Sequence, residues 1–278
     1  MPTTQSPAQD SPREQTWDLP EQEQRPYALL RHSLLLAQRS LTKTRRNPGV
    51  LSDALFLPVI FLVLFVYLFG GEVSGSSRAY LQYIFPGILV MTTILVGMLA
   101  TGLNINIDIK KGVFDRFRSL PINRSAPLIG SVLGDLPRYV LAIVTLFGIG
   151  YALGFRVQTD PASALAAAAL ALTMGFCMSW MNVVIGVLIK EEAIVQTVAF
   201  LGIFPLAFGT NMVVPTSSLP GWLQAWVKVN PVTHAVEGCR GLLVGGPVTA
   251  PVTATLLWSA GFLLVFGPLA VYVYRRRN

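Results

Sequence analysis

The chain has 278 residues, of which 53% are hydrophobic and only 13% are charged, and its mean hydropathy is +0.56. These values are high for a soluble enzyme and ordinary for a protein that crosses a membrane several times. The net charge of +7 does not require nucleic acid as a partner, because the basic residues lie mostly beside apolar segments and form no surface interleaved with aromatic residues.

The N-terminal segment is polar. Residues 1–26 are rich in Pro, Gln, Glu and Thr and lack the apolar stretch of a cleavable signal peptide, so we expect a disordered cytoplasmic tail. Residues 27–46 place apolar residues on one helical face and most Arg and Lys residues elsewhere. This pattern predicts an amphipathic helix on the inner leaflet, held there by apolar burial and by anionic lipid.

Six apolar stretches have roughly the 20 residues that a helix needs to cross the ~30 Å hydrocarbon core of a bilayer. Lipid offers no partner for backbone N–H and C=O groups, so each stretch is predicted to be helical. The predicted spans lie near 50–69, 83–106, 128–153, 162–189, 194–214 and 251–273. The expected fold class is therefore an all-α polytopic membrane protein in which residues 27–278 form one six-span domain.

The distribution of basic residues predicts the orientation, since Lys and Arg near span ends are retained in the cytoplasm. Sixteen of the 21 Lys and Arg residues lie before the first span, in 107–126, in the 190–193 turn or at the C-terminal end. Only four lie in the alternate loops. Both termini are therefore predicted to be cytoplasmic.

A short basic segment separates the second and third predicted spans. Within residues 109–122, Val113, Phe114 and Phe117 recur at helical spacing among charged residues, and Pro121 ends the pattern. One interpretation is a surface helix that dips into lipid headgroups. The other is a helix that docks into a groove on a partner protein, anchored by its Phe side chains and oriented by its Arg side chains.

The loop between the fifth and sixth spans is too long for a simple turn. The spacing of apolar residues in 218–229 predicts a short interfacial helix. Asn230 as N-cap and Pro231 at the first helical position predict a second helix, which ends near Gly245. Two helices at the outer face would line or cover an exit.

Motifs for catalysis are not apparent. The chain has no phosphate-binding loop of the form G-x-x-x-x-G-K-[ST], no serine nucleophile motif with a base in reach, and no metal-ligand spacing around Cys177 or Cys239. We therefore expect no catalytic residue, no metal site and no cofactor in this chain.

Two features inside the predicted spans favour a function or a packing role. Asp135 and Arg138 are three residues apart on the third span and can form an ion pair, either structural or, less simply, part of a proton relay. Phe200, Phe204 and Phe208 form a stripe on the fifth span. Such a stripe can line a passage for a hydrophobic substrate, or it can face lipid or pack against a neighbouring helix.

The chain resembles the membrane subunit of type-2 ABC exporters, in particular the branch like the daunorubicin-resistance permeases of actinomycetes. The resemblance extends from residue 27 to the end. It rests on the motifs "FVYLFGGEVSGS" at 65–76, "YIFPGILVM" at 83–91, "KGVFDRFRSLPI" at 111–122, "GDLPRYVLA" at 134–142 and "NPVTHAVEGCRGL" at 230–242.

The resemblance implies a role for the basic helix. In the family, the helix between spans two and three is the coupling helix that docks into a separate ATPase subunit, which binds ATP and Mg. By position, this role falls on Val113, Phe114, Asp115, Arg116, Phe117 and Arg118. The resemblance also implies a bacterial plasma-membrane location and a second permease copy or a paralogue, with the first and fifth spans at the interface.

The expected function is ATP-driven export of hydrophobic or amphipathic compounds, such as an antibiotic, another drug or a lipid. Two alternatives stay open on the sequence alone. An ion-coupled secondary transporter would work without ATP, although no convincing internal repeat supports it. A membrane scaffold would use the basic helix to bind a partner and would transport nothing.

Overall fold

The computed structural model describes residues 48–113 and 126–276 of the chain. The predicted tail (1–26), the predicted amphipathic helix (27–46) and Phe114 to Arg118 of the predicted coupling helix lie outside the described residues. Every regular element in the described ranges is helical, which confirms the all-α class for this part of the chain.

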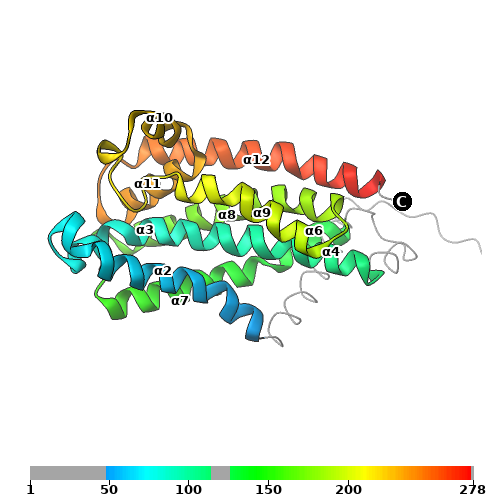
Figure 1. The fold of residues 1–278 in the computed structure, drawn as a ribbon, viewed down its shortest axis with the longest axis horizontal. Helices are drawn as coiled ribbons and strands as arrows, with labels where there is room; N and C mark the ends of the chain where they lie inside the picture. Colours follow the sequence, from blue (N-terminus) through cyan, green and yellow to red (C-terminus); the bar gives the residue numbers. More distant parts are fainter. Residues whose placement is uncertain (1–47, 114–125, 277–278) are drawn as a thin grey trace, which may run out of the picture.

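The elements follow one another in the order shown in Figure 1. They are α2 (Pro48–Ser74), α3 (Ser77–Leu95), a π-helix (Val96–Thr101), α4 (Gly102–Lys110), α6 (Ala126–Gly134), α7 (Leu136–Leu153), α8 (Pro161–Leu188), α9 (Glu192–Phe208), a 3-10 turn (Thr216–Ser218), α10 (Gly221–Val229), α11 (Pro231–Val244) and α12 (Thr249–Arg276).

Four helices of the described chain are long and apolar enough to cross a membrane: Ser77–Lys110, Pro127–Leu153, Pro161–Leu188 and Thr249–Arg276. Two shorter apolar helices, Phe56–Gly71 and Glu192–Phe208, correspond to the first and fifth predicted spans. All six predicted stretches are therefore largely helical, and Phe56–Gly71 is the part of the 27-residue α2 whose side chains the structure describes.

The predicted boundaries of the fifth stretch were wrong at its C-terminal end. Helix α9 ends at Phe208 instead of near residue 214. The Nδ2 group of Asn230 donates to the carbonyls of Leu206 and Gly209, both at 2.8 Å, and so satisfies acceptors that the end of the helix leaves open. The Oδ1 atom of Asn230 accepts from the backbone N–H of Val232 at 2.9 Å, which confirms the predicted N-cap of α11.

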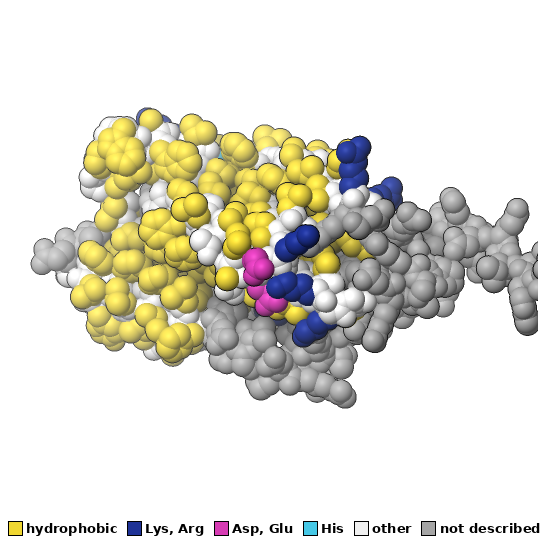
Figure 2. All heavy atoms as spheres, turned by 45° about the vertical axis from the view of Figure 1, so that its right-hand side comes forward, with side chains coloured by type: hydrophobic (Ala, Val, Ile, Leu, Met, Phe, Trp, Pro, Cys, Tyr) yellow, Lys and Arg dark blue, Asp and Glu magenta, His cyan; other side chains and the backbone are white. Residues whose placement is uncertain are grey.

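The helices form an elongated bundle with α10 and α11 at one end and with α4, α6 and the C-terminus at the other (Figure 1). Helix α3 lies at its centre: 89% of the most apolar window of Ser77–Lys110 is buried, against 17% for Thr249–Arg276. Figure 2 shows that the Lys and Arg side chains visible on this face gather mainly near the end that carries the C-terminus, while hydrophobic side chains cover most of the rest.

Glycines allow the π-helix and its flanking helices to pack closely on α8. A Cβ atom at Gly175 would lie 2.7 Å from the carbonyl oxygen of Thr93 in α3, closer than real Cβ atoms approach. Gly102 and Gly186 make a second such contact between α4 and α8. Small residues commonly allow this approach between helices in membranes, where packing rather than water exclusion drives association.

We expect Gly175→Val to destabilise the bundle by about 1–3 kcal/mol, because the added side chain overlaps the α3 backbone and forces the helices apart. Thermal unfolding of the purified chain in mild detergent measures this change. Gly261→Val in α12 is the matched control, because a Cβ atom at Gly261 meets no other atom within 4 Å. Equal unfolding temperatures for the two variants would contradict the close packing of α3 on α8.

Candidate functional site

Helix α4 connects the centre of the bundle to the segment that contains the predicted coupling helix. Its last residue, Lys110, precedes Val113, the only one of the six predicted coupling residues that the structure describes. Val113 is partly exposed at the end of the described segment. The remaining five residues lie outside the described residues, so their docking role stays a prediction.

Two polar side chains of α4 attach it to the end of α8 and to the start of α9. The buried Asn106 donates from Nδ2 to the carbonyl of Gly186 at 3.0 Å and to that of Ile189 at 2.5 Å. The Lys110 ammonium lies 3.2 Å from the Glu192 carboxylate in the first turn of α9. A displacement of α4 would therefore act directly on the start of α9.

The helices on either side of residues 114–125 are both interrupted inside the bundle. The π-helix separates α3 from α4, and a turn at Asp135 separates α6 from α7. The Thr101 hydroxyl, at the end of the π-helix, donates to Oδ2 of Asp135 at 2.8 Å. The two interruptions are thus hydrogen-bonded to each other, and we call Thr101, Asp135 and Arg138 the polar joint.

The structure brings Asp135 and Arg138 together as an ion pair. Nη1 of Arg138 lies 3.5 Å from Oδ1 of Asp135, and each residue is only 4% exposed. Desolvation makes such a buried pair a poor source of stability, although removal of one partner would leave the other charge uncompensated. The pair also connects the two interrupted helices, because Asp135 accepts the hydrogen bond from Thr101.

Helix α8 holds the other side of the π-helix. The buried Asn182 donates from Nδ2 to the carbonyl of Met98 within the π-helix. Sequence reasoning did not select Thr101, Asn106 or Asn182. The available signal was a polar side chain inside an apolar segment, which is costly in a membrane unless it has a partner or a function.

The predicted Phe stripe belongs to a longer aromatic ladder. On α9, the ring centroids of Phe200 and Phe204 are 5.8 Å apart, and those of Phe204 and Phe208 are 4.9 Å apart. Phe208 meets Phe61 of α2 edge to face at 5.7 Å. The ladder continues along α2 through Phe65 and Phe69.

The ladder is accessible in the single chain, since Phe200 is 48% and Phe204 is 51% exposed. The structure therefore joins the first and fifth predicted spans through the contact between Phe61 and Phe208, and it leaves aromatic surface open on α9. Sequence reasoning missed the α2 members, although they repeat at the same four-residue spacing as the α9 stripe.

The two helices of the long loop differ in environment. Helix α10 exposes its tryptophans, with Trp222 at 75% and Trp226 at 43%, as an interfacial helix does. Helix α11 instead packs into the bundle against α3, α8 and α12. It is also held by polar contacts, because Arg240 lies 4.1 Å from the centroid of the Tyr83 ring and donates to the Asn211 carbonyl at 3.1 Å.

The described residues contain no group of three or more His, Cys, Asp and Glu side chains that could hold a metal ion. Both cysteines are buried and unbridged. The features that the described residues do form are the polar joint, the contacts from α4 to α9, and the aromatic ladder.

The sequence was also compared with known proteins. The sequence profile of the ABC-2 type transporter family matches residues 32–244. The daunorubicin resistance ABC transporter permease protein of Streptomyces coeruleorubidus is 38% identical over 240 residues, which cover 86% of this chain and 84% of that protein.

More distant relatives align over a similar length. A probable doxorubicin resistance ABC transporter permease protein of Mycobacterium tuberculosis is 26% identical over 247 residues, covering 88% of this chain and 89% of its own. A putative transport permease of Cyanophora paradoxa is 26% identical over 223 residues, covering 78% and 75%. Together with the apolar helices, these matches show that the chain is a multi-pass membrane protein and belongs to the ABC-2 type transporter family of permeases.

Proposed function

We propose that this permease is the transmembrane subunit of an ATP-driven exporter and that it carries hydrophobic or amphipathic compounds, such as drugs or lipids, out of the cell. The printed names of two relatives, which concern resistance to daunorubicin and doxorubicin, support this substrate class. A separate ATPase subunit would bind ATP and Mg, and this chain would supply the passage.

The proposed topology has six spans in the bacterial plasma membrane, with both termini cytoplasmic. The exposed Lys110, Lys111, Arg275 and Arg276 would then face the cytoplasm, as expected for basic residues near span ends. Residues 1–26 would form the cytoplasmic tail and residues 27–278 the transmembrane domain, with the helix at 27–46 resting on inner-leaflet lipid. Helix α10 would lie at the outer interface.

The observation that carries the proposal is the attachment of α4 to both α8 and α9. Residues 113–118 would dock into the ATPase subunit as the coupling helix, and α4 would transmit its movement. Asn106 donates a hydrogen bond to the Ile189 carbonyl, and Lys110 pairs with Glu192, so these contacts connect α4 to the end of α8 and to the start of α9. The polar joint would allow α4 and α6 to move together relative to α3 and α7.

The proposed mechanism is a shift between two conformational populations. ATP would bring two ATPase subunits together, and the docked coupling helices would follow. Helix α9 would move with α4, and the aromatic ladder would change its exposure along the passage. Substrate would enter from the inner leaflet or the cytoplasm and leave beside α10 and α11.

A second permease copy, or a paralogue, would pair with the chain along α2 and α9. The exposed members of the aromatic ladder and exposed neighbours such as Leu201 give these helices an apolar face without a partner in the single chain. In the pair, the ladder would lie at the boundary between subunits and partly face the passage.

Phe117→Asp should leave membrane insertion intact and reduce ATP-dependent transport to about a tenth or less, because an anchor residue of the docking helix would become charged. Transport into inside-out vesicles and recovery of the ATPase subunit with the tagged permease measure the two effects. Trp222→Asp, on α10 at the opposite end of the bundle from α4, is the control and should keep the ATPase subunit bound.

The outcome of this experiment also separates the alternatives. Unaltered transport by Phe117→Asp would contradict the docking assignment. Purification of an intact permease without any ATPase subunit, together with transport driven by an ion gradient, would favour a secondary transporter.

The link from α4 to α9 predicts a charge-swap effect. Lys110→Glu and Glu192→Lys should each lower transport per ATP hydrolysed, and the double swap should restore it, because the pair is re-formed in the opposite sense. Since both side chains are about half exposed, with 42% and 46% exposure, unfolding stability should change by no more than about 1 kcal/mol in any variant. If the double variant did not recover the transport per ATP hydrolysed, the Lys110–Glu192 pair would have no part in coupling ATP hydrolysis to transport.

The proposed pairing predicts cross-linking at one helix face. Leu201→Cys on α9, where the leucine is 72% exposed, should give a product of two permease chains with a bifunctional thiol reagent in membranes. Leu257→Cys on α12 is the matched control, since Leu257 is 74% exposed but lies outside the proposed interface. A cross-link to a different chain would identify a paralogue, and equal cross-linking at both sites would contradict the assigned face.

A further inference from the structure

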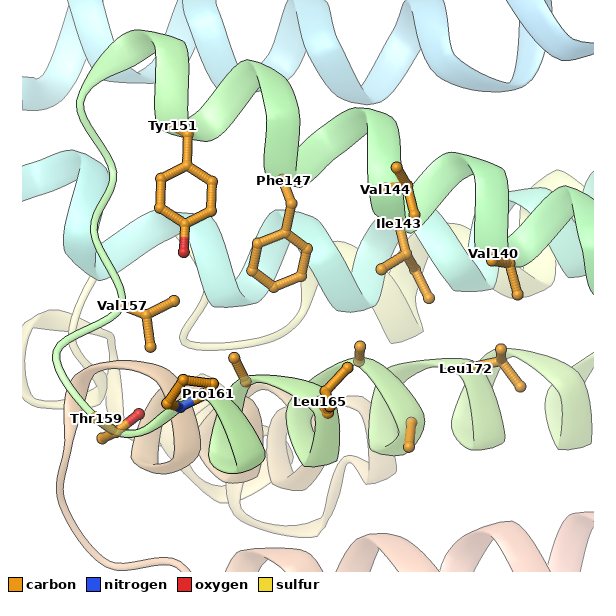
Figure 3. A pocket seen from close by; sticks show the side chains of 13 residues that line it. Val140, Ile143, Val144, Phe147, Tyr151, Val157, Thr159, Pro161, Leu165 and Leu172 are labelled. Carbon is orange, nitrogen blue, oxygen red and sulfur yellow. The ribbon is translucent and has the colours of Figure 1, made fainter.

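An apolar groove lies between α7 and α8, on residues that the proposed exporter mechanism does not use. Its cavity volume is about 770 Å³, within the ~300–1,000 Å³ range typical of small-molecule sites. Figure 3 shows Phe147 and Tyr151 of α7 reaching toward α8, with Val157 at the connecting loop and Leu165 on the opposite wall. The lining contains no residue of α2 or α9, so the groove is separate from the proposed subunit interface.

The groove has the depth of one membrane leaflet. Its α7 wall extends from Tyr151, beside the loop, to Val140. These positions are eleven residues apart, which corresponds to about 16 Å along a helix. This length is about half of the ~30 Å hydrocarbon core.

The groove opens sideways from the bundle. Val140, Val144 and Leu165 line it and are 50%, 60% and 73% exposed. The α8 wall includes Ala164 and Ala168, whose small side chains leave space between the helices. Both walls belong to helices that can cross a membrane, so the opening faces lipid and an acyl chain could enter without passing through water.

Charged groups of both signs lie at the loop end. Arg156 is exposed, and among the described residues its side chain donates hydrogen bonds only from Nη1, to the carbonyls of Tyr151 and Phe155 at 2.8 and 2.7 Å. Its other N–H groups can therefore bind an anion. Asp160 is also exposed, and hydrogen bonds from Ser163 lower the pKa of its carboxyl, which keeps it charged at neutral pH.

We propose that this groove binds one acyl chain of phosphatidylethanolamine, with the lipid phosphate at Arg156 and the ammonium at Asp160. One positive and one negative side chain in the loop match a zwitterionic headgroup better than an anionic one. In the bilayer, an acyl chain is already surrounded by hydrocarbon, so apolar burial alone gives little preference for this site. Selectivity comes from the fit of the chain in the groove and from the two headgroup contacts.

The test uses the full-length permease in mild detergent and phosphatidylethanolamine with a photoactivatable group on one acyl chain. After illumination, the labelled peptides are identified by mass spectrometry, with unlabelled phosphatidylethanolamine or phosphatidylglycerol as competitor. We expect saturable labelling within 140–151 and 161–172, which unlabelled phosphatidylethanolamine displaces more effectively than phosphatidylglycerol does.

Two variants test the binding of the acyl chain and the binding of the headgroup separately. Ala168→Phe fills the groove and should lower labelling at least fivefold, while Val265→Phe on the exposed face of α12 should not change it. Arg156→Gln, on the surface, should weaken labelling about fivefold, the effect expected for the loss of one cation beside the lipid phosphate. Thermal unfolding of each variant confirms that it is folded, and Arg156→Gln keeps the test decisive if Ala168→Phe is not.

Several results would overturn the proposal. Labelling that is not saturable, or is equal on α12, would show contact with bulk lipid only. Equal displacement by phosphatidylglycerol, or no effect of Arg156→Gln, would remove the headgroup assignment. Displacement by a transported drug, but not by phosphatidylethanolamine, would show that the groove holds substrate instead of lipid.

Discussion

Backbone carbonyls that lose a helical partner inside an apolar bundle need another donor, and asparagine side chains supply it at three places in this protein. Asn182 serves the π-helix after α3, Asn106 serves the end of α8, and Asn230 serves the end of α9. Each asparagine comes from a different segment than the break that it satisfies. The amide groups therefore both permit the interruptions and hold neighbouring elements in register across them.

These interruptions determine what the bundle can do. An unbroken helix from Ser77 to Lys110 would transmit movement at one end to the whole of its length. The π-helix instead separates α3 from α4, and the turn at Asp135 separates α6 from α7. The hydrogen bond from Thr101 to Asp135 connects these two interruptions. Close glycine contacts hold both the central segment and α4 on α8, and the Lys110–Glu192 ion pair joins α4 to α9. In the proposed mechanism, α4 would be the part of this assembly that follows the coupling helix.

Hydropathy and cap residues were sufficient to predict much of this fold. The apolar stretches gave the helical segments, and Asn230 followed by Pro231 gave the start of α11, because both signals are local. The end of α9 at Phe208 was missed, although the glycine directly after it, Gly209, is a common helix-stop residue; only the contacts of Asn230 with this end required the three-dimensional arrangement. The same limit applied to the site. The spacing of Asp135 and Arg138 made their contact predictable, whereas the bond from Thr101 and the continuation of the Phe stripe onto α2 required the three-dimensional arrangement.

The length of α9 has a consequence for the membrane itself. Its 17 residues extend about 26 Å, a few ångströms less than the ~30 Å hydrocarbon core. Where such a helix crosses, Thr210 and Asn211 follow it at the depth of acyl chains, and both are buried in protein, with exposures of 5% and 4%. Hydrophobic mismatch of this size favours local thinning of the bilayer beside a short helix. In the proposed exporter, bilayer thickness, and with it the lipid composition of the host membrane, would then bias which conformation of the permease is populated.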